Sequence, residues 1–592
     1  MKSKTTAIWF VLAAALAAVI WYLNDFLPPA APQEVHLFNG LHAGRITRLQ
    51  ITPGGGREIS VLRTNHLWSL EKPFAYPAQP TAIDSLAAAM EKLTATATLS
   101  AAEMSRHKNA DAEYGFDNPQ FRVDVATADG VWHALVGFKT APGDGVYVRI
   151  IGGTDVYVVD PAWLDLLPRD ANVWRDTTLV EMPPTVDWLV ITNGTQVIEL
   201  RRNPTNRLWS MVYPLQTPAD NLRIVTALQQ LRTAKVSQFV SDDPKTDWTG
   251  YGLEPAALDI WLGYGTNMLT ALHVGKDVAG ASAQTYARRD GLNSVVATAK
   301  EPLLLWRGLV NDFRDPNLIE LTAPVAEVEM RNGDNFTLQL RSNEWTVAGE
   351  KFAADQQEIQ DYIKTLGNVR VADFVQDVVT GTGYQKYGLD NPSRQVTLRS
   401  VAGDTNSVIA QLQFGAISTN VVFAKRAREP FVYSVSLDEL NRLSLPGDYF
   451  RDRHIWSFSE TNVATVTVQQ DGKARQMTRT GTNAWSLTAG QGIINPPAIE
   501  EVVHRLGDLN SYGWVGRKFN DENLQLTTNS LAVTIEMKSG EKHTVQFGRG
   551  VQVPSLTALA VVTLDGERWA FIFPPVLYPL IQENLAIPAS NP

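Results

Sequence analysis

The sequence predicts an α+β protein made of four tandem repeats, each a mainly antiparallel sheet with two helices, after one N-terminal transmembrane helix. Three observations indicate this: a tryptophan strand that recurs about every 140 residues, an amphipathic helix after each such strand, and an apolar run near the N-terminus. Antiparallel strands with helices on one side are typical of the α+β class and not of a doubly wound parallel sheet. A unit of this size can hold its own core.

The N-terminal segment predicts a membrane anchor. Lys2 and Lys4 precede an uncharged apolar run from Ala7 to Leu23. As a helix this run spans roughly 26 Å, and its flanks extend it toward the roughly 30 Å of a bilayer core. The lysines favour a cytoplasmic N-terminus. We therefore expect a single-pass protein of the bacterial inner membrane, anchored by residues 6–25, with its bulk in the periplasm or otherwise outside the cytoplasm.

A cleaved signal peptide is the alternative for this segment. A peptidase could use Ala30–Ala31, but this pair lies far beyond the apolar run, and bulky residues 21–23 stand where small ones are needed. An uncleaved anchor is therefore favoured. Residues 1–5 are then the cytoplasmic N-terminus, and residues 26–44 are a linker whose prolines stiffen it.

Four signals recur in one order along the chain, and this is typical of internal repeats. The tryptophans are Trp68, Trp209, Trp345 and Trp485; the Tyr-Gly turns begin at Tyr114, Tyr251 and Tyr387; the strand glycines are Gly137, Gly275, Gly415 and Gly548; and the Arg-Asp pairs are Arg175–Asp176, Arg314–Asp315 and Arg451–Asp452. In the fourth copy the turn has decayed to a stretch around Leu524, and no Arg-Asp pair follows. The predicted repeats are residues 45–184, 185–323, 324–460 and a divergent 461–585, followed by a tail at 586–592.

Each repeat reads as about seven strands and two helices. The strands alternate apolar and polar residues, the pattern of half-buried antiparallel strands. In the second repeat, the helix is expected to bury a stripe made by Leu222, Val225, Leu228 and Leu231. Asp220 or the residue after it can cap this helix.

The recurrent residues favour structural roles. We expect the tryptophans in the core, with exposed glycan-stacking platforms as the alternative. The Tyr-Gly element supplies a backbone bend, and Leu253 and Leu389 after it are expected to enter the core. The Arg-Asp pairs are expected to fix one repeat against the next, with a binding contact as the alternative.

A possible ligand face comes from strand positions at which a basic residue follows an aromatic one. The pairs are Tyr147 with Arg149, Tyr286 with Arg288, and Phe423 with Lys425. Period-two spacing places both members of a pair on one strand face. Lined up, the pairs would form a cationic ladder suited to an anionic polymer such as a polysaccharide; an ordinary solvated strand face is the favoured alternative.

Composition and motifs exclude several classes of function. Cysteine is absent, so disulfides, thiolate metal sites, cysteine nucleophiles and lipidated cysteines are excluded. A net charge of −10 disfavours nucleic acid as a partner. The nine histidines form no helical metal pair, and no nucleophile elbow or phosphate loop is present. We expect no catalytic, cofactor or metal residues and no enzyme; a carboxylate-dependent hydrolase is the remaining catalytic alternative.

The tryptophan strand, the helix and the YGL…P turn together resemble a bacterial family known as domain of unknown function four-three-four-zero. The resemblance covers all four units, strongly in the first three. It implies an N-terminal membrane helix followed by repeated units, and an accessory role beside gliding-motility-type ABC transporter components. We thus expect a membrane-anchored extracytoplasmic interaction protein, with a cell-wall or surface polysaccharide-binding module as the alternative.

Overall fold

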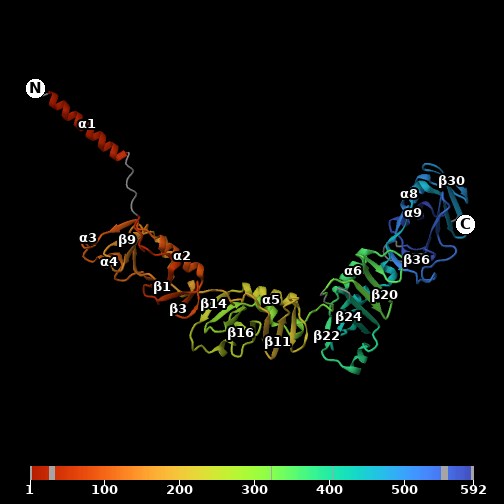
Figure 1. Cartoon of the computed structure of the whole chain (residues 1–592), viewed down its shortest axis with the longest axis horizontal. Helices are drawn as coiled ribbons and strands as arrows, with labels where there is room; N and C mark the ends of the chain where they lie inside the picture. The colour runs from red at the N-terminus through yellow and green to blue at the C-terminus, as the bar shows by residue number, and fades with distance from the viewer. Residues whose placement is uncertain are drawn as a thin grey trace. The chain divides into compact units, whose positions relative to one another are not determined.

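The computed structural model describes residues 3–25, 34–319, 321, 323–402, 405–548 and 558–587. Residues 26–33 of the predicted linker and 588–592 of the predicted tail lie outside this part of the chain. The chain divides into two compact units, Met1–Phe313 and Arg314–Pro592. Each unit contains two large sheets, shown by colour in Figure 1.

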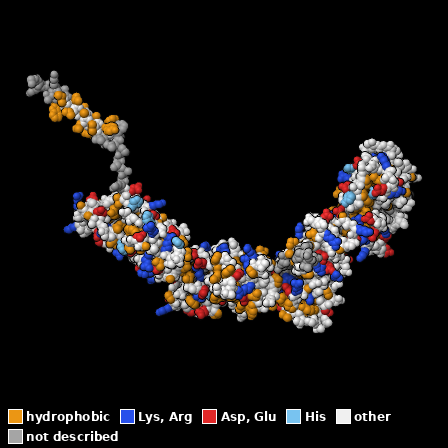
Figure 2. All heavy atoms as spheres, viewed as in Figure 1, with side chains coloured by type: hydrophobic (Ala, Val, Ile, Leu, Met, Phe, Trp, Pro, Cys, Tyr) orange, Lys and Arg blue, Asp and Glu red, His pale blue; other side chains and the backbone are white. Residues whose placement is uncertain are grey.

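The apolar N-terminal segment forms helix α1 (Ser3–Asp25). Its side chains from Ile8 to Tyr22 are exposed, and Figure 2 shows them as hydrophobic spheres along the helix. Within the described ranges, no helix is both long and apolar enough to cross a bilayer. The predicted helix is therefore present, but the structure does not support the transmembrane span, which stays a prediction.

The first sheet has nine strands in the order β4-β3-β2-β1-β6-β7-β8-β9-β5. These are β1 (Ile46–Pro53), β2 (Ile59–Thr64), β3 (Leu67–Lys72), β4 (Tyr76–Pro77), β5 (Ala97–Leu99), β6 (Phe121–Thr127), β7 (Val131–Lys139), β8 (Val146–Ile150) and β9 (Val156–Val159). The helices are η1 (Ala43–Arg45), α2 (Pro80–Lys92), α3 (Ala101–Met104), α4 (Ala110–Tyr114), η2 (Pro161–Leu166) and η3 (Ala171–Trp174), where η marks a 3₁₀ helix.

The second sheet repeats this order as β13-β12-β11-β10-β15-β16-β17-β18-β14. Its strands are β10 (Trp188–Asn193), β11 (Gln196–Arg202), β12 (Trp209–Tyr213), β13 (Thr217–Pro218), β14 (Val236–Ser241), β15 (Leu258–Tyr264), β16 (Asn267–Val278), β17 (Ala281–Arg289) and β18 (Val295–Ala299). Its helices are α5 (Asn221–Thr233), η4 (Trp248–Tyr251), η5 (Glu301–Arg307) and η6 (Val310–Phe313).

The third sheet has eight strands in the order β21-β20-β19-β23-β24-β25-β26-β22. They are β19 (Glu327–Arg331), β20 (Phe336–Arg341), β21 (Glu344–Val347), β22 (Asp373–Gln376), β23 (Arg394–Ala402), β24 (Thr405–Ser418), β25 (Val421–Arg426) and β26 (Val432–Ser436). The helices are α6 (Gln356–Gly367), η7 (Gly381–Tyr387), α7 (Leu437–Leu443) and η8 (Gly447–Phe450).

The fourth sheet keeps the pattern as β30-β29-β28-β33-β34-β35-β36-β32, beside a small sheet of β27 and β31. The strands are β27 (His454–Ser457), β28 (Val463–Gln470), β29 (Lys473–Gly481), β30 (Ala484–Ala489), β31 (Asp508–Asn510), β32 (Gly513–Gly516), β33 (Ala532–Met537), β34 (Lys542–Phe547), β35 (Leu559–Leu564) and β36 (Glu567–Ile572). The helices are η9 (Glu460–Asn462), α8 (Pro496–Leu506) and α9 (Leu577–Asn584).

Antiparallel pairing throughout these sheets, with helices packed on them, confirms the α+β class. Each sheet has eight or nine strands instead of the expected seven, because short strands such as β4 and β5 at the edges carry little sequence signal. Alternate residues of the central strands enter the core, as the burial of Leu49 and Ile51 in β1 shows. The apolar face of α2 contributes Ile83, Leu86 and other residues to the same core.

The predicted buried stripe of α5 is right for Leu231, which is buried, and for Leu228, which packs on the core, but wrong for its other two members. The helix buries Ile224, Ala227 and Leu231, whereas Leu222 and Val225 are exposed. Both stripes have helical spacing, so the sequence alone did not decide which face packs on the sheet. The predicted cap is confirmed, because the Asp220 carboxylate accepts a hydrogen bond from the Arg223 amide.

Candidate functional site

The recurrent tryptophans are core residues, as predicted. Trp68, Trp209, Trp345 and Trp485 are all buried. The indole of Trp68 donates to Asp84 of α2 at 2.9 Å, and the indole of Trp485 donates to Glu500 of α8 at 2.8 Å. Each contact ties a strand to the helix that covers it, so a glycan platform is excluded at these positions.

At each strand glycine, a backbone carbonyl oxygen lies so close that a residue with a Cβ would not fit. The Tyr251 oxygen lies 2.2 Å from the position that a Cβ on Gly275 would take, and the Tyr387 oxygen lies 2.2 Å from that of Gly415. Tyr114 and Gly137 form the same contact at 2.1 Å. No side chain fits at such distances, so the turn and the strand glycine form one structural device.

The fourth sheet retains this device, contrary to the expected decay of its turn. The Leu524 oxygen lies 2.2 Å from the Cβ position of Gly548. The next residue, Gln525, has φ of 51°, where the other turns place a glycine such as Gly252 at 67°. The fourth turn therefore keeps the geometry of the other three, although it lacks their tyrosine and glycine.

The predicted aromatic members of the ligand face pack on the tyrosines of these turns. The ring centroids of Tyr147 and Tyr114 are 4.7 Å apart. Tyr286 contacts Tyr251 and Phe423 contacts Tyr387 in the same edge-on manner, each with centroids 5.0 Å apart. Their partly buried rings therefore brace the turn against the strand.

The basic members lie over aromatic rings near the turns. The guanidinium of Arg149 lies 4.2 Å from the Phe116 ring and 2.5 Å from the Asp111 carboxylate. The guanidinium of Arg288 lies 3.9 Å from the Trp248 ring, and burial lowers the pKa of this arginine.

In the third sheet, the ammonium of Lys425 lies 4.1 Å from the Tyr384 ring, and burial lowers the pKa of the lysine. In the fourth sheet the register places Leu559 and Val561 at the two positions of the pair. The three pairs thus occupy three different sheets and act at least as turn braces. Their role as a ligand face stays a prediction.

The arginines of the Arg-Asp pairs bond a different carboxylate from that of the adjacent aspartate. Arg175, wholly buried, forms a bidentate bond with Asp242 at 2.8 and 2.9 Å and donates to Ser294 at 3.0 Å. Its guanidinium lies 3.6 Å from the Phe239 ring and 4.1 Å from the Tyr76 ring. The first two sheets are therefore joined by an arginine in an aromatic cage, which confirms the predicted junction role but not an Arg175–Asp176 pair.

Arg314, in the second compact unit, likewise combines an acidic partner with aromatic rings, although these rings, Phe374, Phe431 and Tyr433, all belong to the third sheet or its loops. It bonds Asp377 at 2.6 Å and lies 4.0 Å from the Phe374 ring. Asp377 follows β22 as Asp242 follows β14, so the acidic partner occupies an equivalent position in both sheets. The adjacent Asp315 instead accepts a hydrogen bond from the Asn317 amide.

At the junction between the third and fourth sheets, the position equivalent to Asp242 and Asp377 carries a basic residue instead of an acidic one. The Arg451 side chain, 12% exposed, lies 4.3 Å from the Trp569 ring, but the residue after β32 is Arg517. Arg517 bonds Asp448 and Glu350, both at 2.7 Å. The hydrogen bond to Asp448, followed by that to Glu350, raises the pKa of Arg517.

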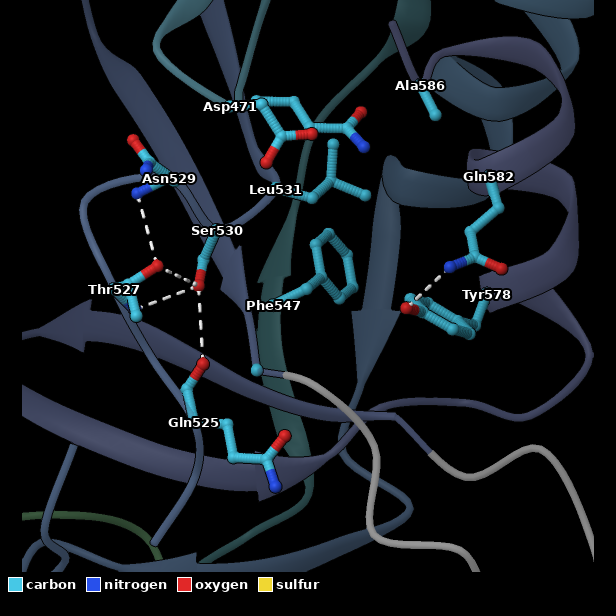
Figure 3. Close-up of a pocket in the computed structure, with 12 residues that line it drawn as sticks. Asp471, Gln525, Thr527, Asn529, Ser530, Leu531, Phe547, Tyr578, Gln582 and Ala586 are labelled. Carbon is cyan, nitrogen blue, oxygen red and sulfur yellow. Dashed lines mark hydrogen bonds between the residues drawn. The ribbon is translucent and has the colours of Figure 1, made fainter. Parts of the chain in front are cut away.

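A groove of about 800 Å³ lies beside the divergent turn of the fourth sheet (Figure 3). Figure 3 shows Thr527, Asn529 and Ser530 on one side and helix α9 with Tyr578 and Gln582 on the other. The rings of Tyr578 and Phe547 lie 5.4 Å apart. Amides, hydroxyls and aromatic faces dominate the lining, a chemistry that suits a neutral polar ligand.

Internal hydrogen bonds fix part of this lining. The Ser530 hydroxyl accepts from the Thr527 amide at 2.9 Å, and the Gln582 carboxamide donates to the Tyr578 hydroxyl at 2.7 Å. Burial raises the pKa of the Tyr578 hydroxyl above its ordinary value. Sequence analysis missed this groove; the lost Tyr-Gly pair, replaced by a residue with a long polar side chain, was the signal that could have found it.

No cluster of three or more metal-ligating side chains occurs in the part of the chain that the structure describes.

Comparison with known proteins assigns the chain to a family. No curated protein and no solved structure matches it. A family described as Domain of unknown function (DUF4340) matches residues 68–207, 209–382 and 345–529. The matches begin at or next to Trp68, Trp209 and Trp345, so the profile follows the tryptophan strands. They cover well over half of the sequence, and the chain therefore belongs to the DUF4340 family.

Proposed function

We propose that the chain is a membrane-anchored extracytoplasmic interaction protein, an accessory of an ABC-type transport or envelope complex. The observation that carries this proposal is the Arg175 junction, in which one sheet is fastened to the next by a buried cation that forms a bidentate bond with Asp242. A buried cation with its partner in another sheet fixes the relative position of both. Such coupling suits a protein that presents an extended surface to a partner.

Helix α1 supports the anchor part of the proposal. It exposes large apolar side chains, among them Trp9, Phe10 and Trp21. Apolar surface of this kind calls for burial by a membrane or a protein partner. Lys2 and Lys4 favour a cytoplasmic N-terminus, with the sheets in the periplasm.

Affinity purification of the tagged full-length chain from crosslinked native membranes tests the proposal. We expect transporter permease or ATPase subunits in stoichiometric amounts. The matched variant is Asp242→Ala, which unfastens the first junction; the expected result is reduced recovery of the partner. Asp243→Ala, an exposed neighbour, should leave recovery unchanged. Recovery of the chain alone from wild-type membranes would contradict the accessory role.

A second candidate function is the binding of cell-wall or surface polysaccharide, which the fourth-sheet groove favours. Its amides and aromatic rings match the hydrogen-bonding groups and apolar faces of sugars. Asn529→Ala and Gln582→Ala should each weaken binding of a neutral cell-wall polysaccharide severalfold, while the exposed Asn523→Ala should not. Equal binding by all three variants would exclude the groove.

A further inference from the structure

A second groove, of about 580 Å³, lies against the second sheet and is lined by three arginines. Arg202 ends β11, Arg207 lies in the hairpin that follows, and Arg232 lies in the last turn of α5. Tyr264 and Asn203 also line it. None of the six residues predicted as a ligand face contributes to it.

The three arginines form no ion pair within the described residues. The acidic side chain of the lining, Asp187, accepts a hydrogen bond from the Gly265 amide at 2.8 Å. The groove is therefore positively charged on a chain whose net charge is −10. Elsewhere in the same sheet arginines do find carboxylates, as Arg201 does with Glu199 at 3.1 Å.

The first and fourth sheets show what the arginine of β11 does where this groove is absent. Arg202, Arg63 and Arg479 occupy equivalent strand positions, because each pairs with the recurrent tryptophan of the neighbouring strand. Arg479 donates to the carbonyl oxygens of Glu460 and Val463 at 2.9 and 3.1 Å, which fastens the segment before the first strand.

Arg63 makes a similar, longer contact with the Gly44 oxygen at 3.4 Å. Arg202 is used differently: its Nε donates to the backbone oxygen of Arg207 at 2.8 Å. In the second sheet the side chain at this position does not hold the segment before β10, which is bonded instead by the Arg202 amide, a donor to the Asp187 oxygen at 2.8 Å. The Arg202 side chain joins two more arginines around an open groove.

Arg207 adopts a backbone conformation that disfavours any residue with a Cβ. Its φ is 61°, in the left-handed region, which costs an L-residue roughly 1 kcal/mol or more. Such outliers concentrate at functional sites. Glycine or asparagine would serve the hairpin better, so arginine here indicates a use for the guanidinium.

We propose that this groove binds the carboxylate or phosphate groups of an anionic glycan. Guanidinium groups bond such oxyanions in a bidentate manner. Because the three arginines form no ion pairs within the part of the chain that the structure describes, none has to be broken when an anion binds. The Tyr264 ring and the Asn203 amide supply the apolar and hydrogen-bonding contacts that a sugar requires. This site goes beyond the accessory function, since it concerns a ligand and not a transporter subunit.

Equilibrium binding of fluorescent oligogalacturonate to the purified full-length chain tests the proposal, with dextran as the neutral probe. Arg207→Gly and Arg232→Ala should each weaken binding about tenfold, because each removes one oxyanion contact. Arg341→Ala, an exposed arginine at the corresponding hairpin of the third sheet, should leave affinity unchanged. Arg207→Gly should also leave hydrogen exchange of the β11 and β12 amides unchanged or slower, because glycine relieves the strained backbone while keeping the carbonyl that Arg202 contacts.

Three results would overturn the proposal. One is wild-type binding of oligogalacturonate no tighter than that of dextran. Another is equal loss in Arg341→Ala, which would indicate nonspecific attraction. The third is binding of inorganic phosphate without binding of any anionic glycan, which would restrict the groove to small anions. Loss of partner subunits in membrane purification would not affect any of these measurements, so the two proposals fail separately.

Discussion

The second and fourth sheets share a strand order, yet they carry different residues at two recurrent positions, one at the junction between sheets and one in the turn. The second carries Asp242 at its junction and Gly252 in its turn, and the fourth carries Arg517 and Gln525. In both sheets the turn carbonyl still lies over a strand glycine. Close backbone contacts therefore constrain this fold more tightly than charge or side-chain identity does.

The charge reversal is tolerated because neighbouring residues changed with it. Equivalent bridges, Ala78 to Arg175 and Ala354 to Arg451, align Phe74 in the first sheet with Glu350 in the third. Phe74 contributes an aromatic face to the cage of Arg175, whereas Glu350 bonds Arg517. The acidic residue of this junction, Glu350, thus belongs to the earlier of the two sheets, whereas in the first junction the acidic residue, Asp242, belongs to the later one.

The largest effect is expected for Asp242→Ala. Removing the partner of a buried arginine leaves an uncompensated charge, and the loss is about 3 kcal/mol. Because a chain of several sheets does not unfold in one step, hydrogen exchange of the β14 and β18 amides is the suitable measurement. Asp243→Ala, with an exposed side chain, should cost less than about 1 kcal/mol. Equal exchange in both variants would mean that the junction contributes little.

Alanine at the strand glycines tests the shared backbone contact. Gly275→Ala and Gly548→Ala should each destabilise their sheet by about 2 kcal/mol, since a Cβ would collide with a carbonyl oxygen. Exchange rates in β16 and β34 report the two effects. Gly280 lies at an open position with φ of 76°, so Gly280→Ala introduces backbone strain without a collision and serves to separate the two effects. A much smaller loss at Gly548 would show that the fourth turn has loosened.

The turn residues themselves should respond in opposite directions. Gln525→Gly should stabilise the fourth sheet by about 1 kcal/mol, because only glycine tolerates positive φ without cost. Gly252→Gln should destabilise the second sheet by more than this, because its Cβ would also lie 3.0 Å from the Lys276 amide nitrogen. Exchange of the amides around each turn measures both. Destabilisation by Gln525→Gly would indicate that its side chain holds the groove together.

The smallest effect is expected for Glu350→Gln. Arg517 keeps Asp448 and Glu567 as partners, and the Glu350 side chain is partly exposed, so the loss should stay below about 1 kcal/mol. Raised salt should reduce the difference between variant and wild type. A loss as large as that of Asp242→Ala would make the two junctions energetically equivalent.

Repetition made much of the fold predictable, because each copy served as a check on the others. The class, the buried tryptophans and the core leucines Leu253 and Leu389 followed from it, and the structure confirms them. The partner of Arg175 could not be found in this way, since Asp242 lies in another sheet and far along the chain. The adjacent Asp176 was the nearer but wrong partner.

The grooves escaped prediction for a different reason. The arginine groove depends on the path of the segment before β10 and on the length of one hairpin, neither of which has a periodic signal. Its three arginines come from separate elements, so no motif links them. The face of α5 was predicted only in part, because two overlapping stripes were compatible with one helical period.

The Arg175 junction also bears on how such a chain can grow. One copy ends in the arginine and supplies Tyr76, while the next supplies Phe239 and Asp242. Duplicating a whole copy therefore reproduces both halves of the fastening at once, and no new interface has to be invented. A duplication that began within a copy would separate the arginine from its cage, which gives selection a physical reason to preserve the spacing of the copies.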